Sequence, residues 1–168
     1  MQCLIDGAAV HVETAGAGEA ALVLVHGACH DHRAWTPVLD ALGDSGIALY
    51  APDLPAHGAS AGPALPDIAA QAQWLLRLLD ACGLTRCALA GHSMGSLIAL
   101  HAAALAPQRV SHLALVGSAV DQALHVGSSR IFHERACTAG VRAAARLASP
   151  GHVGYIDGNM PDRASFST

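Results

Sequence analysis

The sequence predicts an α/β fold in which a doubly wound, mostly parallel sheet carries helices on both faces. Continuous apolar runs alternate with segments of helical spacing, as in covered parallel strands and the helices that join them. The pattern G-x-S-x-G stands between one such run and a long apolar stretch, at residues 91–95. With 168 residues, 52% of them apolar and 13% charged, the chain can bury one sizeable core.

The elements begin with a small hairpin over residues 3–14 that turns at Asp6-Gly7, a common hairpin signal. The predicted strands of the main sheet cover 21–25, 47–51, 87–90 and 110–117. The first predicted helix has Thr36 as its cap and Pro37 as its first residue, and the other two cover 68–83 and 94–106. Gly43 and Pro107 are expected to end the first and third helices, and Asp67 to cap the second. This order of strands and helices favours right-handed crossovers.

The chain divides near residue 120. Residues 1–120 form the predicted core domain, and residues 121–168 are interpreted as a partial helical cap or a disordered tail. Within the second part, residues 129–148 have helical spacing, and residues 149–168 are rich in Gly, Pro, Ser and Asp and predict a loop. No strand-like apolar run is apparent after residue 120.

Charge and cysteine content bear on partners and location. The net charge is −4 without a basic block, which argues against nucleic acid and anionic membranes as partners. An odd number of cysteines without C-x-x-C spacing is typical of reduced, mostly buried thiols in a cytoplasmic protein. They are Cys3, Cys29, Cys82, Cys87 and Cys137. The N-terminus shows no basic segment followed by an apolar run, so no signal peptide is expected.

The residues Gly91-His92-Ser93-Met94-Gly95 predict a nucleophile elbow. Such a turn between strand and helix holds the serine in a strained backbone conformation and lifts its Oγ clear of the sheet. Glycine suits both flanking positions because a Cβ there would collide with a neighbouring strand or helix. The alternative is an ordinary strand-to-helix turn in a chain rich in small residues.

Oxyanion donors are predicted beside this serine. The segment His26-Gly27-Ala28 follows the first central strand, and in this topology it lies next to the elbow. The backbone N–H groups of Ala28 and Met94 can then converge on one oxygen of a substrate. His26, Gly27 and His92 are the candidate substrate-binding residues. As alternatives, His26-Gly27 is a strand-ending turn with a packed histidine, and His92 packs beneath the elbow.

Three motifs occur in order along the chain: V-H-G at 25–27, D-L-P-A-H-G-A-S at 53–60 and G-H-S-M-G at 91–95. With them, residues 3–120 resemble the α/β-hydrolase superfamily, in the branch with a His-Gly oxyanion loop. The middle motif usually reads D-x-P-G-H-G-x-S, from which Ala56 departs. The resemblance implies supporting roles for Asp53 and His57. Serine at position 93 implies a serine hydrolase rather than the dehalogenase and epoxide-hydrolase relatives, which use aspartate there.

The resemblance also implies a triad in the chain order serine, acid, histidine. Asp121 is the candidate acid, because it lies just past the strand at 110–117, where some members of the superfamily carry theirs. No histidine is assigned as the base. His125, His133 and His152 follow no predicted strand and are interpreted as surface or cap residues.

The chain contains 11 histidines, which raises the question of a metal. No predicted helix carries H-x-x-x-H or H-E-x-x-H spacing, and His30 and His32 are only two residues apart on a loop. The sequence therefore predicts no metal site and no cofactor.

Two functions remain open from the sequence. The first is a serine hydrolase acting on a small-molecule acyl substrate, such as an ester, lactone or thioester. The second is a truncated, catalytically inactive α/β-hydrolase fragment without the acid and histidine of the triad. In that case the strand at 110–117 becomes an exposed apolar edge through which the chain can self-associate.

Overall fold

The computed structural model describes residues 1–117, 132–134 and 154–156. In this part of the chain, strands form one mixed sheet in the order β1-β2-β4-β3-β5-β6-β8-β7. The strands are β1 (Gln2–Ile5), β2 (Ala8–Ala15), β3 (Ala20–Val25), β4 (Ile47–Pro52), β5 (Cys87–His92), β6 (Val110–Val116), β7 (Phe132–Glu134) and β8 (Gly154–Ile156). Strands β1 and β2 form the predicted hairpin, β2 runs antiparallel to β4, and the other pairs are parallel. The predicted fold class is confirmed.

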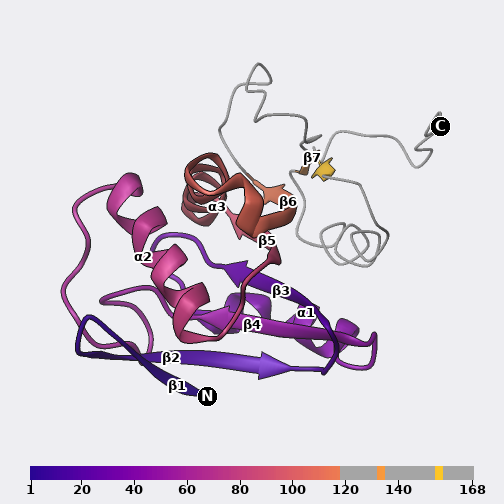
Figure 1. The fold of residues 1–168 in the computed structure, drawn as a ribbon, viewed down its shortest axis with the longest axis horizontal. Coiled ribbons are helices and arrows are strands. Elements are labelled where there is room, and N and C mark those ends of the chain that lie inside the picture. Colours follow the sequence, from indigo (N-terminus) through magenta and orange to yellow (C-terminus); the bar gives the residue numbers. More distant parts are fainter. Residues whose placement is uncertain (118–131, 135–153, 157–168) are drawn as a thin grey trace.

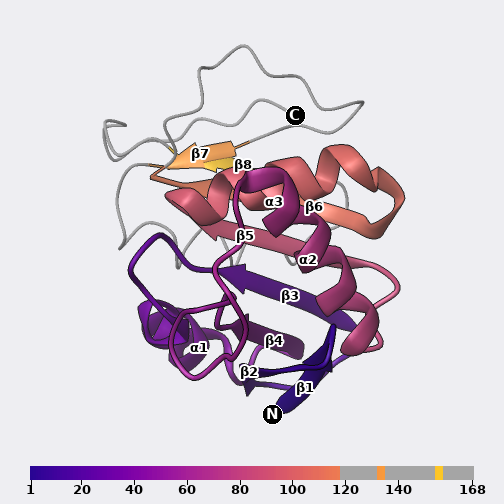
Figure 2. The ribbon, with the colours of Figure 1, turned by 90° about the vertical axis from the view of Figure 1, so that its left-hand side faces the viewer.

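Helices cover both faces of the sheet. They are α1 (Thr36–Leu42), α2 (Ile68–Ala81) and α3 (Met94–Leu105), with the short 3₁₀ helices η1 (His32–Trp35) and η2 (Pro107–Arg109). Figures 1 and 2 show α2 and α3 side by side on one face and α1 on the other. Among the described residues, no helix has both the length and the apolar character needed to cross a membrane.

The core lies in two layers, one on each side of the sheet. Along β3 the side chains alternate, so that Leu22 and Leu24 pack with Trp35 on the α1 side. Val23 and Val25 point the other way and join the layer under α2 and α3. Because both faces of β3 are buried, its sequence is a continuous apolar run, as expected of a central parallel strand.

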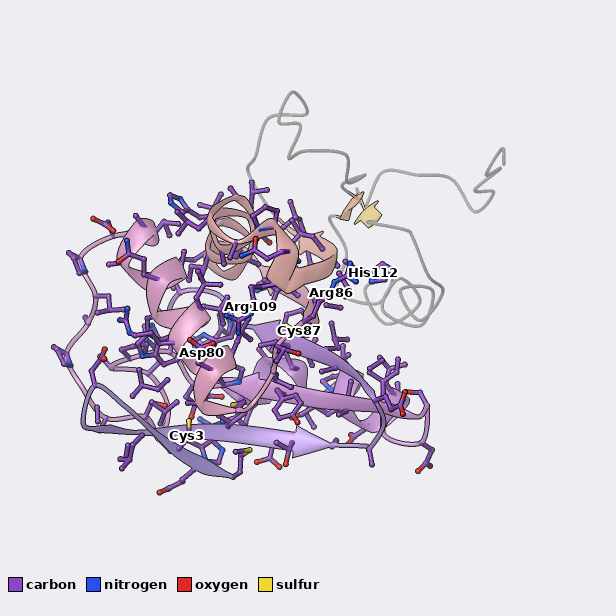
Figure 3. All side chains as sticks on the ribbon, viewed as in Figure 1. Cys3, Asp80, Arg86, Cys87, Arg109 and His112 are labelled. Carbon is purple, nitrogen blue, oxygen red and sulfur yellow. The ribbon has the colours of Figure 1, made fainter. Side chains whose placement is uncertain are left out.

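Arg109, at the end of η2, connects helix α2 to the turn that precedes β5. Nη2 of Arg109 lies 2.7 Å from Oδ1 of Asp80 and 2.8 Å from the carbonyl oxygen of Leu84, and its Nε donates to the carbonyl of Thr85 at 2.8 Å. Figure 3 shows Asp80 and Arg109 together near the start of β5, which begins at Cys87. The guanidinium thereby satisfies carbonyl groups that the turn after α2 leaves without helical partners.

The structure differs from the sequence prediction after β6. The predicted helix at 129–148 is wrong at Phe132–Glu134, which forms β7, and the predicted loop at 149–168 is wrong at Gly154–Ile156, which forms β8. Strand β8 pairs with β6 over Ala114–Val116, so the predicted exposed edge is covered there. A strand of three residues is too short to show a side-chain period in the sequence. Strand β8 forms because its backbone pairs with the free edge of β6, and β7 pairs with β8 in turn.

The described cysteines are free thiols, but they are less buried than expected. Only Cys87 is buried, whereas Cys3 and Cys82 are half-buried and Cys29 is exposed. Cys137 lies outside the described residues. Burial raises the pKa of the Cys87 thiol to about 12, which keeps it protonated and unreactive near neutral pH.

Replacing Asp67 tests whether its side chain stabilises the start of α2. The Asp67 carboxylate accepts a hydrogen bond from the Ala70 N–H at 2.7 Å. We expect Asp67→Ala to lower the free energy of unfolding by about 1 kcal/mol in urea denaturation, since an N-terminal amide loses its partner. Asp67→Ser keeps a capping oxygen and should lose about half as much or less. Equal losses in the two variants would contradict the capping role.

Candidate active site

Ser93 occupies a strained turn between β5 and α3. Its backbone angles are φ 53° and ψ −117°, a conformation that residues with a side chain rarely adopt. The Ser93 N–H donates to the carbonyl of Val116 at 2.8 Å, which ties the turn to the neighbouring strand β6. The Ser93 side chain makes no capping hydrogen bond to α3, so its hydroxyl does not serve as the N-cap of the helix.

Two glycines make this turn sterically possible. A Cβ on Gly91 would lie 2.2 Å from the carbonyl oxygen of Gly95, and a Cβ on Gly95 would lie 2.2 Å from that of Val25. Both obstacles are backbone atoms, which cannot move aside as a flexible side chain can. The collisions are those that the sequence pattern predicts, with the adjacent helix in one case and with strand β3 in the other.

Ser96 is a supporting residue that the sequence did not single out. It is fully buried, and its Oγ lies 2.6 Å from the carbonyl of Gly91 and 3.1 Å from that of Val116. The hydroxyl thus joins β5 to its neighbouring strand β6 next to the turn. A serine one residue after G-x-S-x-G has no distinctive pattern, so only the fold shows its role.

The His26-Gly27 loop lies directly against the elbow. A Cβ on Gly27 would be 3.2 Å from the Cβ of Ser93 and 3.1 Å from Nδ1 of His92. A glycine here therefore lets the loop approach the serine closely. The same closeness is required if an amide in this loop is to reach a substrate oxygen next to Ser93.

The side chain of His26 faces the protein interior. It is fully buried, and its Nε2 accepts a hydrogen bond from the Leu54 N–H at 3.0 Å. The proton therefore sits on Nδ1, which donates to the carbonyl of Gly27 at 2.8 Å. Both ring nitrogens are hydrogen-bonded to backbone groups, so this side chain supports the loop. Burial lowers its pKa below the ordinary value.

The two predicted oxyanion donors are the backbone N–H groups of Met94 and Ala28. Met94 is the first residue of α3, so its N–H has no partner within the helix. Ala28 follows Gly27, and its carbonyl accepts from the ring of His30, with Nδ1 at 3.0 Å. Cys29 comes next with a positive φ of 59°, which turns the chain sharply after Ala28.

His92 is half-buried between the loop and the end of β6. Its ring lies close to Gly27 and 3.6 Å from the position that a Cβ on Gly117 would take. The His30 ring meets it edge-on with centroids 5.9 Å apart. Burial lowers the pKa of His92, and the neighbouring His30 acts in the same direction. The geometry fits packing around the elbow, and contact of His92 with a substrate remains a prediction.

Asp53 organises the loop that faces His26. Oδ1 accepts from the N–H and from the ring Nδ1 of His32 at 2.7 and 2.9 Å, and Oδ2 accepts from the Ala59 N–H at 2.8 Å. Complete burial would raise the pKa of the carboxyl, but these hydrogen bonds outweigh it, so the pKa lies below the ordinary value. A Cβ on Gly58 would lie 2.2 Å from Oδ2, which explains the glycine there.

The unusual alanine of this loop keeps a glycine-like conformation. Ala56 has a φ of 62°, in the left-handed region. The substitution therefore leaves the turn in place at a cost in strain. The next residue, His57, places its Nδ1 2.9 Å from the carbonyl of Pro55, and its ring lies 5.2 Å from that of His26. Its placement agrees with a supporting role.

The predicted acid and the downstream histidines all follow β6 in the chain. Asp121, His125 and His152 lie outside the described residues. His133 belongs to the short strand β7, of which the backbone is described. Within residues 1–117 the structure records no hydrogen bond from a histidine to Oγ of Ser93.

A protein-family model matches most of the described chain. The model of the alpha/beta hydrolase fold matches residues 20–132, about two thirds of the chain. The chain belongs to this family. The matched region of this α/β-hydrolase chain contains the elbow, the His-Gly loop and the Asp53 loop, so the three parts of the site lie within the family segment.

Curated relatives match about two thirds of this chain. It is 43% identical over 109 residues to the dihydrolipoyllysine-residue acetyltransferase component of the acetoin cleaving system of Pseudomonas putida, which is 64% of this chain and 29% of that protein. It is 37% identical over 112 residues to lipase LipV of Mycobacterium tuberculosis (66% and 42%). It is 34% identical over 111 residues to the pimeloyl-[acyl-carrier protein] methyl ester esterase of Nitrosomonas europaea (66% and 42%).

Solved structures show the same fold. A bacterial membrane phospholipase A superposes with a TM-score of 0.68 at 32% identity, covering 74% of this chain and 41% of that one. The enol-lactonase from Burkholderia xenovorans superposes with a TM-score of 0.65 at 27% identity (70% and 46%). The α/β-hydrolase chain thus spans less than half the length of each of these relatives.

The strained alanine gives a stability prediction. We expect Ala56→Gly to raise the free energy of unfolding by about 0.5–1 kcal/mol, because the relief of left-handed strain exceeds the entropy that glycine adds to the unfolded chain. Chemical denaturation measures the change. The matched control is Ala70→Gly in the first turn of α2, where the same substitution should be destabilising, by up to about 1 kcal/mol. A loss of stability in Ala56→Gly would contradict the assignment of strain.

Burial of His26 and His92 predicts a pH dependence of stability. Both pKa values are lowered in the folded protein, whereas in the unfolded chain they are near 6.5. As the pH falls below about 6.5, the unfolded state binds protons that the folded state does not, so stability decreases by at most about 1.4 kcal/mol per pH unit for each group. Urea denaturation at several pH values between about 7.5 and 5.5 measures the decrease.

The variant His26→Asn removes one of these groups and keeps an oxygen that can accept from the Leu54 N–H. Its stability should fall less steeply with decreasing pH than that of the unmodified chain. Parallel slopes for the two proteins would show that His26 does not contribute.

Proposed function

We propose that the chain is a serine hydrolase acting on a small acyl substrate, such as an ester, lactone or thioester, with Ser93 as the nucleophile. The observation that carries the proposal is the backbone of Ser93. Its φ of 53° and ψ of −117° persist only because Gly91 and Gly95 allow backbone atoms to approach closely. Strain of this kind at a serine between a strand and a helix is typical of a residue presented to a substrate.

In the proposed reaction, Oγ of Ser93 attacks the carbonyl carbon of the substrate and the carbonyl oxygen gains negative charge. The N–H groups of Ala28 and Met94 donate hydrogen bonds to that oxygen. Met94 begins α3, where the unpaired amide and the helix dipole both favour an anion. The close packing of Gly27 on Ser93 supports a donor on the other side. Fixed backbone donors stabilise the developing charge without having to reorient.

The names of the relatives support acyl chemistry. The esterase of Nitrosomonas europaea, the lipase of Mycobacterium tuberculosis and the enol-lactonase of Burkholderia xenovorans are named for ester or lactone substrates. The fold alone does not determine the substrate, because an epoxide hydrolase, CorEH, also superposes, with a TM-score of 0.66 at 28% identity. Serine at the elbow favours the acyl substrates for this chain.

The second candidate function is a catalytically inactive member of the fold. Ser93 needs a base for its proton, and in residues 1–117 no histidine is hydrogen-bonded to its Oγ. The candidate acid Asp121 lies outside the described residues. Without a base and an acid, the elbow and the donors would bind an acyl group but would accelerate its transfer only weakly.

A fluorophosphonate probe separates the two candidates, because it labels only a serine that a neighbouring base has activated. We expect stoichiometric labelling of the native chain, loss of labelling in Ser93→Ala, and loss after heat denaturation. Ser45→Ala is the matched control: this exposed serine lies in the turn after α1 and its Oγ donates to the Leu42 carbonyl, so labelling should be unchanged. A native chain that is labelled no more than Ser93→Ala would establish the inactive form.

A further inference from the structure

Three residues with metal-binding side chains meet at one end of the sheet. His11 comes from β2, His32 from the start of η1, and Asp53 directly follows β4. They are far apart in the sequence, yet one ligand atom from each lies within 4.8 Å of the others. None of the three was expected to bind a metal from the sequence.

Part of this cluster is a hydrogen-bonded pair. Nδ1 of His32 lies 2.9 Å from Oδ1 of Asp53, and the His32 backbone N–H donates to the same oxygen at 2.7 Å. The carboxylate is completely buried, whereas the His32 side chain is 21% exposed. The pair is therefore held in place on the protein side and can be reached from solvent at the ring.

The unexplained member is His11. Its Nε2 is buried and has no hydrogen-bond partner among the described residues. It lies 3.4 Å from Oε2 of Glu13, outside hydrogen-bonding geometry, and the His11 and His32 rings are 4.6 Å apart. A buried ring nitrogen without a hydrogen-bond partner is energetically unfavourable. Binding of an ion or molecule from solvent to this nitrogen would remove that cost.

We propose that His11, His32, Asp53 and Glu13 form a binding site for a divalent first-row transition metal, with Zn²⁺ as the expected ion. Two neutral imidazoles and two carboxylates are donors that Zn²⁺ accepts, and the two negative charges balance the cation. Ligand atoms around a tetrahedral zinc ion lie about 3.3 Å apart. The separations of 3.4 Å between His11 and Glu13 and 2.9 Å between His32 and Asp53 are near this value. The ligand atoms of His11, His32 and Asp53, which lie within 4.8 Å of one another, would draw together around the ion.

The surroundings permit binding. The side chains of His11 and Glu13 are 22% and 47% exposed, so an ion can reach them from solvent. Coordination by Nδ1 of His32 releases the proton of that nitrogen to solvent. Bound metal would connect β2, η1 and the loop after β4, segments that come together only in the folded chain. It should therefore stabilise the fold by an amount that rises with the logarithm of the free metal concentration above the Kd.

The test is calorimetric titration of ZnCl₂ into the full chain after removal of metals with a chelator. We expect binding of one equivalent, and a rise in Tm of about 5–10 °C at a free zinc concentration about 100 times the Kd. His11→Gln should weaken binding at least tenfold, about 1.4 kcal/mol. The variant leaves Asp53 and His32 paired, and the backbone of His11 keeps its bonds to Ser60 and Asp53.

Two further variants make the result decisive. Glu13→Gln changes a half-exposed residue, so it should fold even if His11→Gln does not, and it should weaken zinc binding about threefold or more. His101→Gln, a partly buried histidine on α3, is the matched control and should bind zinc like the unmodified chain, as should Ser93→Ala. No binding at all, or binding that both His11→Gln and Glu13→Gln retain in full, would overturn the proposal.

Discussion

The close contact of backbone with backbone at the elbow is the constraint on which the rest of the structure depends. Strand β3, the end of β5 and the first turn of α3 meet where no side chain separates them, because positions 91 and 95 are glycines. This contact forces Ser93 into its unusual backbone conformation. It also sets the distance between α3 and the sheet, and hence the packing of the whole α2 and α3 layer on β3 and β5.

A second layer of polar groups supports the elbow from beneath. His26 and Asp53 are both completely buried, and each is held by hydrogen bonds to backbone N–H or carbonyl groups. Buried polar groups whose bonds are all made define a single arrangement more sharply than apolar packing does. Through Leu54, His26 connects the loop at Gly27 to the loop after β4. The position of the loop beside Ser93 therefore depends on residues that do not themselves face a substrate.

Most of the fold was predictable because its elements carry strong local signals. The apolar run in β3, the Asp67 cap of α2 and the hairpin turn at Asp6-Gly7 each depend on residues close together in sequence. Prediction failed at β7 and β8, because β8 forms by pairing with β6 and β7 by pairing with β8, and strands of three residues have no periodicity of their own. It also missed Ser96 and His32, whose roles rest on carbonyl and carboxylate groups about 20 residues away in sequence.

The sequence by itself determined that the chain has the α/β-hydrolase fold with a serine between a strand and a helix, because β5, Ser93 and α3 are contiguous and their signals are local. Only the tertiary structure decided which buried groups support that serine, that Ala56 keeps the conformation of a glycine, and that His11 lies next to His32 and Asp53. Those relations join separate strands and loops. Their distances depend on how the sheet is ordered and how its layers pack, which no local pattern encodes.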